Sequence, residues 1–360
     1  MILKTYKKHL LSKFTKKLLL VSFIFFILVL ILNLLEEINF LKDSETNFIT
    51  PVLLTLLNTP SLLREMLPFI FLISTQFFFI DIYENKEILT LKQFGLDNLS
   101  LLKFLSLTSF IYGIFIIIFF YYFSAVCKNQ YLKIKNNYTK DNKYLAVITK
   151  NGIWIKDTSS EGVVIINADR IEDKFLINLS ITKLSNNFII QKNIIAEKAD
   201  IRSSNWKLTE AVITNAENNS VKLKNTNFKS NFDFDRINNL FSDMSSLTYF
   251  GLLKLKKDYE IIGYSTDELE IQSHKFYSLP FMLMAMTIIS TIIMFNNKFQ
   301  KNILLNLLIG IFFSVLIYYI THFSNVLGAN GRLPIILSVW FPIIIIFIIS
   351  SIGIVRLNEK

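Results

Sequence analysis

Six long apolar runs constrain this chain more than any other feature of its sequence. A helix that crosses a bilayer needs about 20 mostly apolar residues. The runs, which approach or exceed that length, cover roughly residues 18–35, 62–82, 99–125, 276–295, 303–323 and 333–355. Hydrophobic residues make up 52% of the chain and charged residues only 18%. A soluble fold could not bury so much apolar surface, so we predict an α-helical membrane protein with six transmembrane helices.

A long polar segment separates the third apolar run from the fourth. It is rich in Asn, Lys, Asp and Ser. We therefore predict a first transmembrane half at residues 1–127, an extramembrane domain at 128–273 and a second transmembrane half at 274–360, with three spans in each half. The first run is too long for a signal-peptide core and lacks a small-x-small cleavage site, so we expect it to remain as the first span.

The short loops carry their positive charge unevenly. One side holds the lysine-rich N-terminus, the loop after the fourth run and the C-terminal tail: Lys4, Lys7, Lys8, Lys13, Lys16, Lys17, Lys298, Lys301, Arg356 and Lys360. The other side holds only Lys42 and Arg332, with Arg64 at the edge of a run. The positive-inside rule then places both termini in the cytoplasm and the large domain outside. The net charge of +10 forms no basic stripe with interleaved aromatic residues, so we expect no nucleic-acid partner.

The extramembrane domain has the pattern of a β fold. Its short runs of β-branched and aromatic residues cover 144–149, 152–156, 163–167, 175–184, 188–191, 194–201, 206–208, 211–214 and 221–223. Many short strands at nearly regular spacing favour a sandwich or a jelly roll over a βαβ fold. The pattern becomes helical from residue 246. Ser265-Thr266-Asp267-Glu268 has the form of a capping box, which predicts the start of a helix that leads to the fourth span.

The sequence lacks the motifs of the common catalytic sites. It contains no G-x-x-x-x-G-K-[ST], no H-E-x-x-H and no G-x-S-x-G, and its three histidines are scattered. Its single cysteine excludes an intramolecular disulfide. Few polar residues interrupt the spans, chiefly Asn33, Gln76 and His322. We therefore expect no catalytic residue, metal or cofactor, and favour a transporter subunit that takes its energy from another chain.

A charged connector, residues 84–96, joins the second run to the third. Ile88, Leu91 and Phe94 or Gly95 recur at helical spacing, with charged side chains around them. Such a short amphipathic helix either rests on the bilayer surface or fits a groove of a soluble partner. Acidic residues offset the lysines here, which favours the groove. We predict a coupling helix that transmits the motion of a cytoplasmic ATPase, with these candidate residues: Glu84, Glu87, Leu91, Phe94 and Gly95.

Four short motifs follow one another along the chain. They are K-E-I-L-T-L-K-Q-F-G at 86–95, N-G-I-W-I-K-D at 151–157, H-K followed by proline at 274–280, and L-P-I followed by W-F-P at 333–342. Together with the three-domain-three layout, they resemble the lipopolysaccharide export permeases of the LptF/LptG family, and the G member more than the F member. In that family the first motif forms the coupling helix and the second opens the outer β-jellyroll.

The resemblance implies half of a transporter in the inner membrane of a Gram-negative bacterium. Its partners would be an F-type homologous permease, two copies of a cytoplasmic ATPase subunit and a bitopic LptC-like periplasmic protein. The outer domains would receive lipopolysaccharide extracted from the membrane. One alternative is a permease of another ATP-driven lipid or lipoprotein exporter, but those resemble a four-span layout. Another is a membrane-anchored β scaffold that transports nothing.

Lipid A carries phosphates and acyl chains, so its binding site should combine cations with an apolar wall. The predicted sidedness leaves four candidate cations near the outer surface: Lys42, Arg64, Lys275 and Arg332. Each could instead anchor its helix at the interface. Family members carry basic residues where this chain has Asn33-Leu34-Leu35-Glu36-Glu37, which is a departure. The prolines near the span ends either kink a helix or start one: Pro60, Pro68, Pro280, Pro334 and Pro342.

Overall fold

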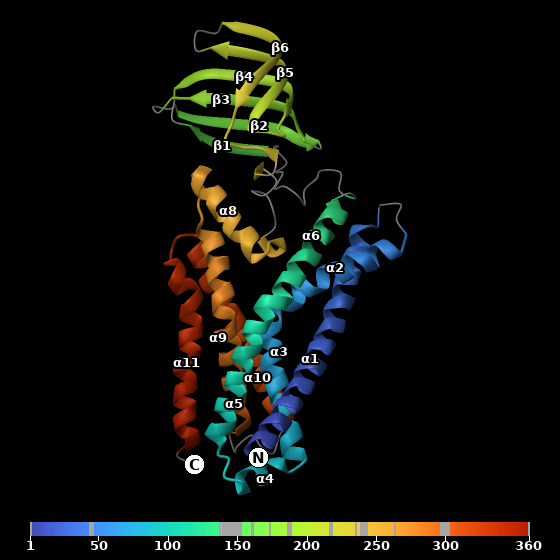
Figure 1. Ribbon diagram of the computed structural model, residues 1–360, viewed down its shortest axis with the longest axis vertical. Helices are drawn as coiled ribbons and strands as arrows, with labels where there is room; N and C mark the ends of the chain where they lie inside the picture. The colour runs from blue at the N-terminus through green and yellow to red at the C-terminus, as the bar shows by residue number, and fades with distance from the viewer. Residues whose placement is uncertain are drawn as a thin grey trace. The chain divides into compact units, whose positions relative to one another are not determined.

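The computed structural model divides the chain into two compact units. It describes residues 2–42, 47–136, 138, 153–159, 162–172, 174–185, 189–215, 219–234, 236–237, 244–262, 264–295 and 303–358. The first unit combines Met1–Lys128 with Asp267–Lys360, and the second is Asn129–Thr266. The first is a bundle of helices, whereas the second is built on an antiparallel sheet (Figure 1).

Six helices in the described part of the chain are long and apolar enough to cross a membrane. Their elements are α1 (Ile2–Phe40), α3 (Leu67–Glu84), α5 (Asn98–Phe115) with its continuation through the π-helical η1 (Ile116–Tyr121) into α6 (Tyr122–Asn136), α9 (Asp267–Phe295), α10 (Ile303–Ala329) and α11 (Ile335–Asn358). Each overlaps one of the six apolar runs, so the prediction of six apolar helices is confirmed. α9 also begins where the capping box predicts a helix start.

A helix that the sequence analysis did not predict precedes the second span. α2 spans Ile49–Glu65, and Met66 alone separates it from α3. Buried polar side chains and two prolines interrupt the apolar pattern of α2, which explains why its periodicity was not recognised. Pro60 lies inside α2, so helix initiation is the wrong explanation for this proline. Pro280 lies inside α9 and is likewise not a helix start.

α3 and α9 form the centre of the bundle. About 61% and 67% of their most apolar windows are buried, against 17–22% for α1, the α5–α6 span and α10. Small polar side chains join the central helices to their neighbours: Thr287 donates to Ser109 (2.7 Å) and Ser290 donates to the backbone oxygen of Leu72 (2.8 Å). Bonds of this kind hold helices together in a membrane, where no hydrophobic effect drives them to associate.

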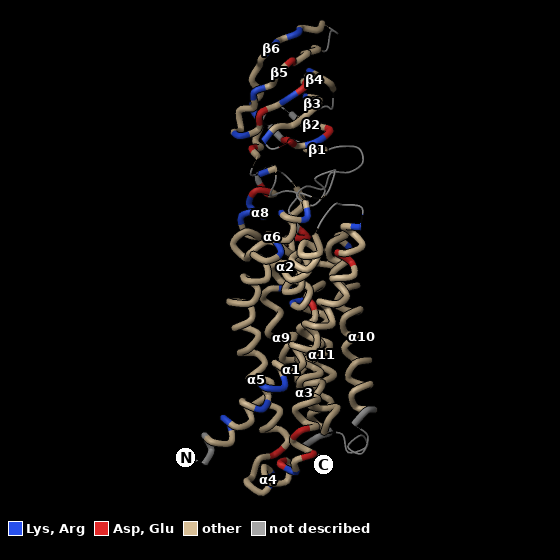
Figure 2. Tube along the Cα trace, turned by 90° about the vertical axis from the view of Figure 1, so that its right-hand side faces the viewer, with Lys and Arg blue, Asp and Glu red and all other residues tan. Residues whose placement is uncertain are grey.

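Both chain termini and the short helix α4 (Glu87–Gln93) lie at the same end of the helical unit (Figure 1). An even number of spans requires this placement of the two termini. Figure 2 shows basic and acidic residues gathered at this end, around α4 and the N-terminal part of α1. The connector, the N-terminal lysines and the C-terminus thus lie at one end of the helical unit.

The second unit contains six antiparallel strands whose order in the sheet follows the chain. They are β1 (Ile153–Ser159), β2 (Gly162–Glu172), β3 (Phe175–Leu184), β4 (Ile190–Asp200), β5 (Asn205–Asn215) and β6 (Ser220–Lys229). The predicted strand at 144–149 lies outside the described residues. Two pairs of predicted short strands each form one longer strand, β4 and β5. Within β5, Glu210 has a left-handed backbone (φ 52°), which interrupts the pattern without shifting the register.

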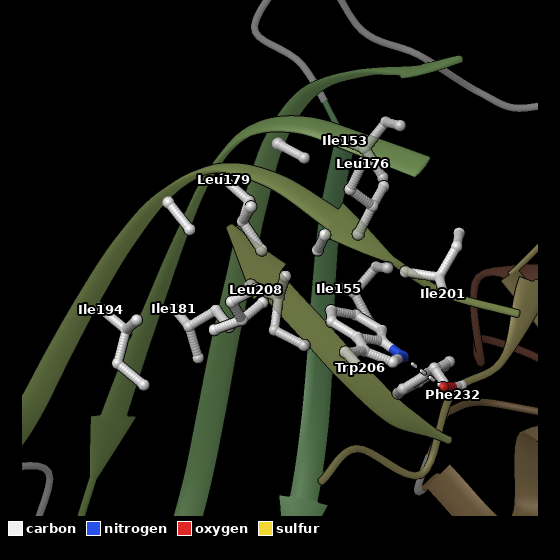
Figure 3. Packing of buried hydrophobic residues seen from close by; sticks show 14 of the residues in the cluster. Ile153, Ile155, Leu176, Leu179, Ile181, Ile194, Ile201, Trp206, Leu208 and Phe232 are labelled. Carbon is white, nitrogen blue, oxygen red and sulfur yellow. Dashed lines mark hydrogen bonds between the residues drawn. The ribbon is translucent and has the colours of Figure 1, made fainter. Parts of the chain in front are cut away.

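The described strands form one curved sheet with a buried face, not the two sheets expected for a sandwich or jelly roll. Trp206 lies fully buried on that face, and its indole N–H donates to the backbone oxygen of Phe232 (2.7 Å; Figure 3). The buried carboxylate of Asp157 on β1 accepts hydrogen bonds from Ser230 Oγ (2.8 Å) and from the backbone N–H (3.0 Å) and Nδ2 (2.8 Å) of Asn231. The segment after β6 is therefore tied back to β1.

A helix follows the sheet, as the change of pattern at residue 246 predicts. α8 (Tyr249–Ile262) comes after the short 3-10 helix η2 (Met244–Ser246). Tyr259 of α8 and the nearby Tyr264 pack against the buried face of the sheet. α8 therefore belongs to the sheet unit and helps to close its core.

Candidate functional site

The predicted coupling segment folds as the short helix α4 between two residues with left-handed backbones. Lys86 precedes it with φ 55°, and Gly95 follows it with φ 79°. At its C-terminal end the N–H of Gly95 donates to Lys92 O (2.9 Å) and the N–H of Leu96 to Leu91 O (3.1 Å). This is a Schellman motif, in which glycine adopts the left-handed conformation at little cost. Gly95 therefore fixes where the helix stops and how the chain turns into α5.

The apolar stripe of α4 divides into a buried half and an exposed half. Ile88 and Leu91 are buried in a cluster with side chains of α1 and α3. Leu89 and Phe94 remain 58% and 71% exposed. Leu91 therefore holds α4 against its own chain, while Phe94 is presented outward. The sequence analysis did not count Leu89 among the candidate residues.

Four short contacts connect the acidic residues around α4 to α1. Lys13 Nζ lies 2.6 Å from Glu87 Oε1 and 2.7 Å from Asp81 Oδ2. His9 Nε2 lies 3.2 Å from Glu87 Oε2, and Lys17 Nζ lies 2.8 Å from Asp81 Oδ1. His9, Lys13 and Lys17 recur every fourth residue, so they share one face of α1. We call these three residues the basic ladder.

The sequence analysis used the N-terminal lysines only to orient the chain. It did not single out His9 or Asp81. Two features of the sequence could have indicated these residues: the four-residue spacing of the basic ladder, and the position of Asp81 at the end of the second apolar run. Glu87 was a predicted candidate, and the structure places its carboxylate against α1. Glu84 and Lys92, by contrast, are exposed.

Burial and hydrogen bonding act in opposite directions on Glu87. Partial burial by itself would raise the pKa of its carboxyl group. The hydrogen bonds from Lys13 and His9, and the charges of those residues, outweigh burial and lower this pKa below its ordinary value. The carboxylate is thus stabilised in its charged form by the ladder, and the contact depends on that charge.

Two of the four predicted outer cations lie near the junction of α2 and α3. The guanidinium of Arg64 lies 4.4 Å from the centre of the Tyr121 ring, and its Nη1 donates to Ser124 Oγ (3.3 Å). Lys275 of α9 is exposed and lies within electrostatic reach of Glu65. Lys42 after α1 and Arg332 after α10 are also exposed.

A further cation near α2 was missed by the sequence analysis. Lys128 of α6 donates to Asn58 Oδ1 (2.8 Å), and Asn58 in turn donates to Asn33 Oδ1 (3.0 Å). Asn33 and Asn58 are both buried. The chain of hydrogen bonds connects α1, α2 and α6. A lysine at the end of the third apolar run, on the same predicted side as Arg64, was the signal in the sequence.

Comparison with known proteins decides the family. The model of the family described as "Lipopolysaccharide export system permease LptF/LptG" matches residues 8–356. The chain belongs to the LptF/LptG family. A comparison with curated proteins gave no match. The resemblance noted in the sequence is thereby confirmed, and the matched family covers both F and G members.

Membership in the LptF/LptG family fixes the class of function. The chain is a lipopolysaccharide export permease, a transporter subunit rather than an enzyme, and it works with other Lpt components. Family membership and the six apolar helices indicate a multi-pass inner-membrane protein. Within the described residues, no group of three or more His, Cys, Asp or Glu side chains could hold a metal ion.

Two of the sequence motifs that resemble the LptF/LptG family meet in the helical unit. His274 belongs to the motif in α9, and its Nδ1 lies 3.5 Å from the indole nitrogen of Trp340, which belongs to the motif in α11. In the strand motif, Trp154 is exposed, whereas Asp157 is buried and ties the segment after β6 to β1. These contacts give the motif residues His274, Trp340 and Asp157 structural roles.

Proposed function

We propose that this chain is the G-like transmembrane subunit of an ATP-driven lipopolysaccharide exporter, and that α4 docks on a cytoplasmic ATPase subunit. The observation that carries this proposal is the outward half of the α4 stripe. Leu89 and Phe94 expose large apolar surface next to the charged residues Glu84 and Lys92. An amphipathic helix with such a face fits a groove of a soluble partner. Glu84 at the end of α3 and Glu87 at the start of α4 disfavour the alternative of adsorption to an anionic bilayer.

The arrangement of the bundle supports the sidedness that this role needs. Both termini and α4 lie at one end of the helical unit (Figure 1). The lysine-rich N-terminus then assigns that end to the cytoplasm, and the sheet unit to the periplasm. There the sheet unit would form part of a bridge with an F-type homologue and an LptC-like protein, on the route that builds the outer membrane.

The predicted residues in and around α4 have different roles in this proposal. Leu91 and Glu87 hold the helix on α1, Gly95 sets its end, and Phe94 contacts the ATPase together with Leu89. Glu84 lies exposed and offers a carboxylate to a basic residue of the ATPase. Two copies of the ATPase would serve this chain and its homologue, one copy at each α4.

The predicted outer cations supply the substrate contacts of this proposal. Arg64 and Lys275 share a neighbour, because Glu65, which follows Arg64 in the chain, acts electrostatically on Lys275. Together with Lys42 and Arg332, they would neutralise the phosphates of lipid A. Exposed apolar side chains of the spans would contact its acyl chains.

A pair of phenylalanine variants tests the docking of α4. Phe94→Ser removes an exposed ring on α4, whereas Phe48→Ser removes a ring of nearly equal exposure, 70% against 71%, just before α2. Burial of a phenylalanine contributes about 1.5–3 kcal/mol, so we expect Phe94→Ser to weaken ATPase association roughly tenfold or more. Phe48→Ser should leave it unchanged. The measurements are co-purification of the ATPase and ATP-dependent release of lipopolysaccharide from proteoliposomes.

The same assay separates the competing functions. Full ATPase association and export by the Phe94→Ser protein would remove the docking role of α4. Release of phospholipid or lipoprotein in place of lipopolysaccharide would indicate another exporter. Absence of any ATP-dependent release from the complete complex would favour the β scaffold.

A further inference from the structure

The structure assigns Lys13 a positioning role: we infer that the basic ladder clamps α1 to α4, so that the first span moves with the coupling helix. This inference rests on the proposed docking of α4 and adds a route by which its motion enters the membrane. The chain connects α4 directly only to α3 and α5. The clamp would join it to a third helix that is distant in the sequence.

Lys13 is the centre of the clamp. Its ammonium group lies within 2.7 Å of both Asp81 at the end of α3 and Glu87 at the start of α4. The Lys13 side chain is only 18% exposed, so both contacts are partly shielded from water. Shielding makes a charge–charge contact stronger than at an open surface. One lysine thus fastens both sides of the α3–α4 turn to α1.

Apolar packing beside the ladder supports the same contact. Leu10 and Phe14 of α1 are fully buried and belong to the same cluster as Ile88 and Leu91 of α4. Phe14 also packs edge-on against Phe78 of α3, with 5.8 Å between the ring centres. α4 therefore presents one apolar side to α1, while its other side, with Leu89 and Phe94, stays exposed.

The α3–α4 turn makes this bracing necessary. Only Asn85 and Lys86 separate the two helices, and Lys86 has a left-handed backbone. A residue that carries a Cβ atom is strained in that conformation, whereas glycine is not. The seven residues of α4 are also too few for a stable helix of their own. The orientation of α4 relative to α3 therefore depends on side-chain contacts. These include the contacts of Glu87 with His9 and Lys13 of α1 and the apolar cluster that α4 shares with α1 and α3.

The length of α1 lets the clamp act on the first span. Its 39 residues extend about 58 Å, roughly twice the thickness of the apolar core of a bilayer. The basic ladder precedes the apolar run that begins at Leu18, so it lies on an extension of the span. Because a helix is stiff over this length, a displacement of α4 would be passed along α1 rather than absorbed in a loop.

Spin labels on the two helices test the clamp directly. In a Cys127→Ala background, Leu11→Cys and Lys92→Cys place labels on exposed positions of α1 and α4, away from the proposed ATPase contacts Leu89 and Phe94. We expect one narrow distance distribution in the complete complex, with and without nucleotide. Lys13→Gln should broaden the distance distribution, whereas Lys13→Arg should keep it narrow. Lys16→Gln should leave the distribution unchanged, because Lys16 is exposed on another side of α1. Asp81→Asn, which leaves α1 intact, should broaden it as well.

A functional measurement distinguishes coupling from mere folding. In proteoliposomes, the Lys13→Gln complex should still hydrolyse ATP but release less lipopolysaccharide per ATP, by about fivefold or more. An unchanged distance distribution in both Lys13→Gln and Asp81→Asn would overturn the clamp, as would an unchanged export ratio. If Phe94→Ser left ATPase association intact while Lys13→Gln still broadened the distances, the docking proposal would fail and the clamp would stand.

Discussion

The buried carboxylate of Asp157 offers the sharpest test of how the sheet unit is held together. It accepts three hydrogen bonds from Ser230 and Asn231, which lie just after the last strand. Asp157→Ala would leave all three donors without their acceptor. Each bond to a charged group contributes about 1.5–3 kcal/mol, but the contributions overlap. Because Asn231 is exposed and can bind water instead, we expect a total loss of about 3 kcal/mol in the free energy of unfolding.

Tryptophan fluorescence can follow the sheet unit within the intact protein. The chain has three tryptophans, and Trp340→Phe leaves only Trp154 and Trp206, both in the sheet. Thermal unfolding of the detergent-solubilised protein would then report on that unit. A loss of about 3 kcal/mol corresponds to a fall of roughly 10 °C in Tm for a domain of this size.

Glu172→Ala is the matched control for Asp157→Ala. Glu172 ends β2 and pairs with Arg170, but both side chains are more than half exposed. A surface pair of this kind contributes at most about 1 kcal/mol, so its loss should lower Tm by only a few degrees. Equal shifts for the two variants would show that the bonds to Asp157 do not close the sheet.

Three further predictions concern the helical unit. Gly95→Ala should cost about 1 kcal/mol at its left-handed backbone and speed hydrogen exchange in α4, whereas Gly95→Asn should cost less. Gly113→Ala places a Cβ 2.6 Å from the Pro280 backbone and should cost about 1–3 kcal/mol in thermal unfolding, whereas the control Gly251→Ala in α8 of the sheet unit, with its nearest atom at 3.4 Å, should be nearly neutral. The lowered pKa of Glu87 means that its contact stabilises α4 above the ordinary carboxyl pKa and is lost as pH falls through the lowered value. Hydrogen exchange should therefore show α4 loosening in acid, and Glu87→Gln should abolish that pH dependence.

Composition and periodicity were sufficient to predict the membrane part of the fold. The six spans and the start of α9 follow from apolar length and a capping box. α2 was missed because Pro51, Pro60 and buried polar residues break its pattern. The π-helical turn at Ile116–Tyr121 was missed because its uninterrupted apolar residues look the same in any helix. In the sheet, the left-handed Glu210 looks like a turn when only its neighbours in sequence are considered.

The candidate site shows a similar division between local and long-range information. The stripe of α4 is a local pattern, so a short helix in this connector could be predicted from the sequence. The partner of Glu87 could not, because Lys13 lies 74 residues earlier and is one of many lysines. The count of charged residues in the loops used Lys13 only to predict the orientation of the chain in the membrane. Only the packing of α1 on α3 and α4 distinguishes it from Lys16, which remains exposed.

The buried residues of α1 determine how that helix can vary in evolution. Beyond the ladder, its buried positions are Val21, Val29, Asn33 and Glu37, which recur at multiples of four residues. The remaining positions along the apolar part of α1 require only an apolar side chain. We therefore expect substitutions to accumulate rapidly at most positions around α1 and slowly at the buried positions along one side. A family-wide comparison would then show a period of four in this span, a signature easily mistaken for a dimerisation heptad.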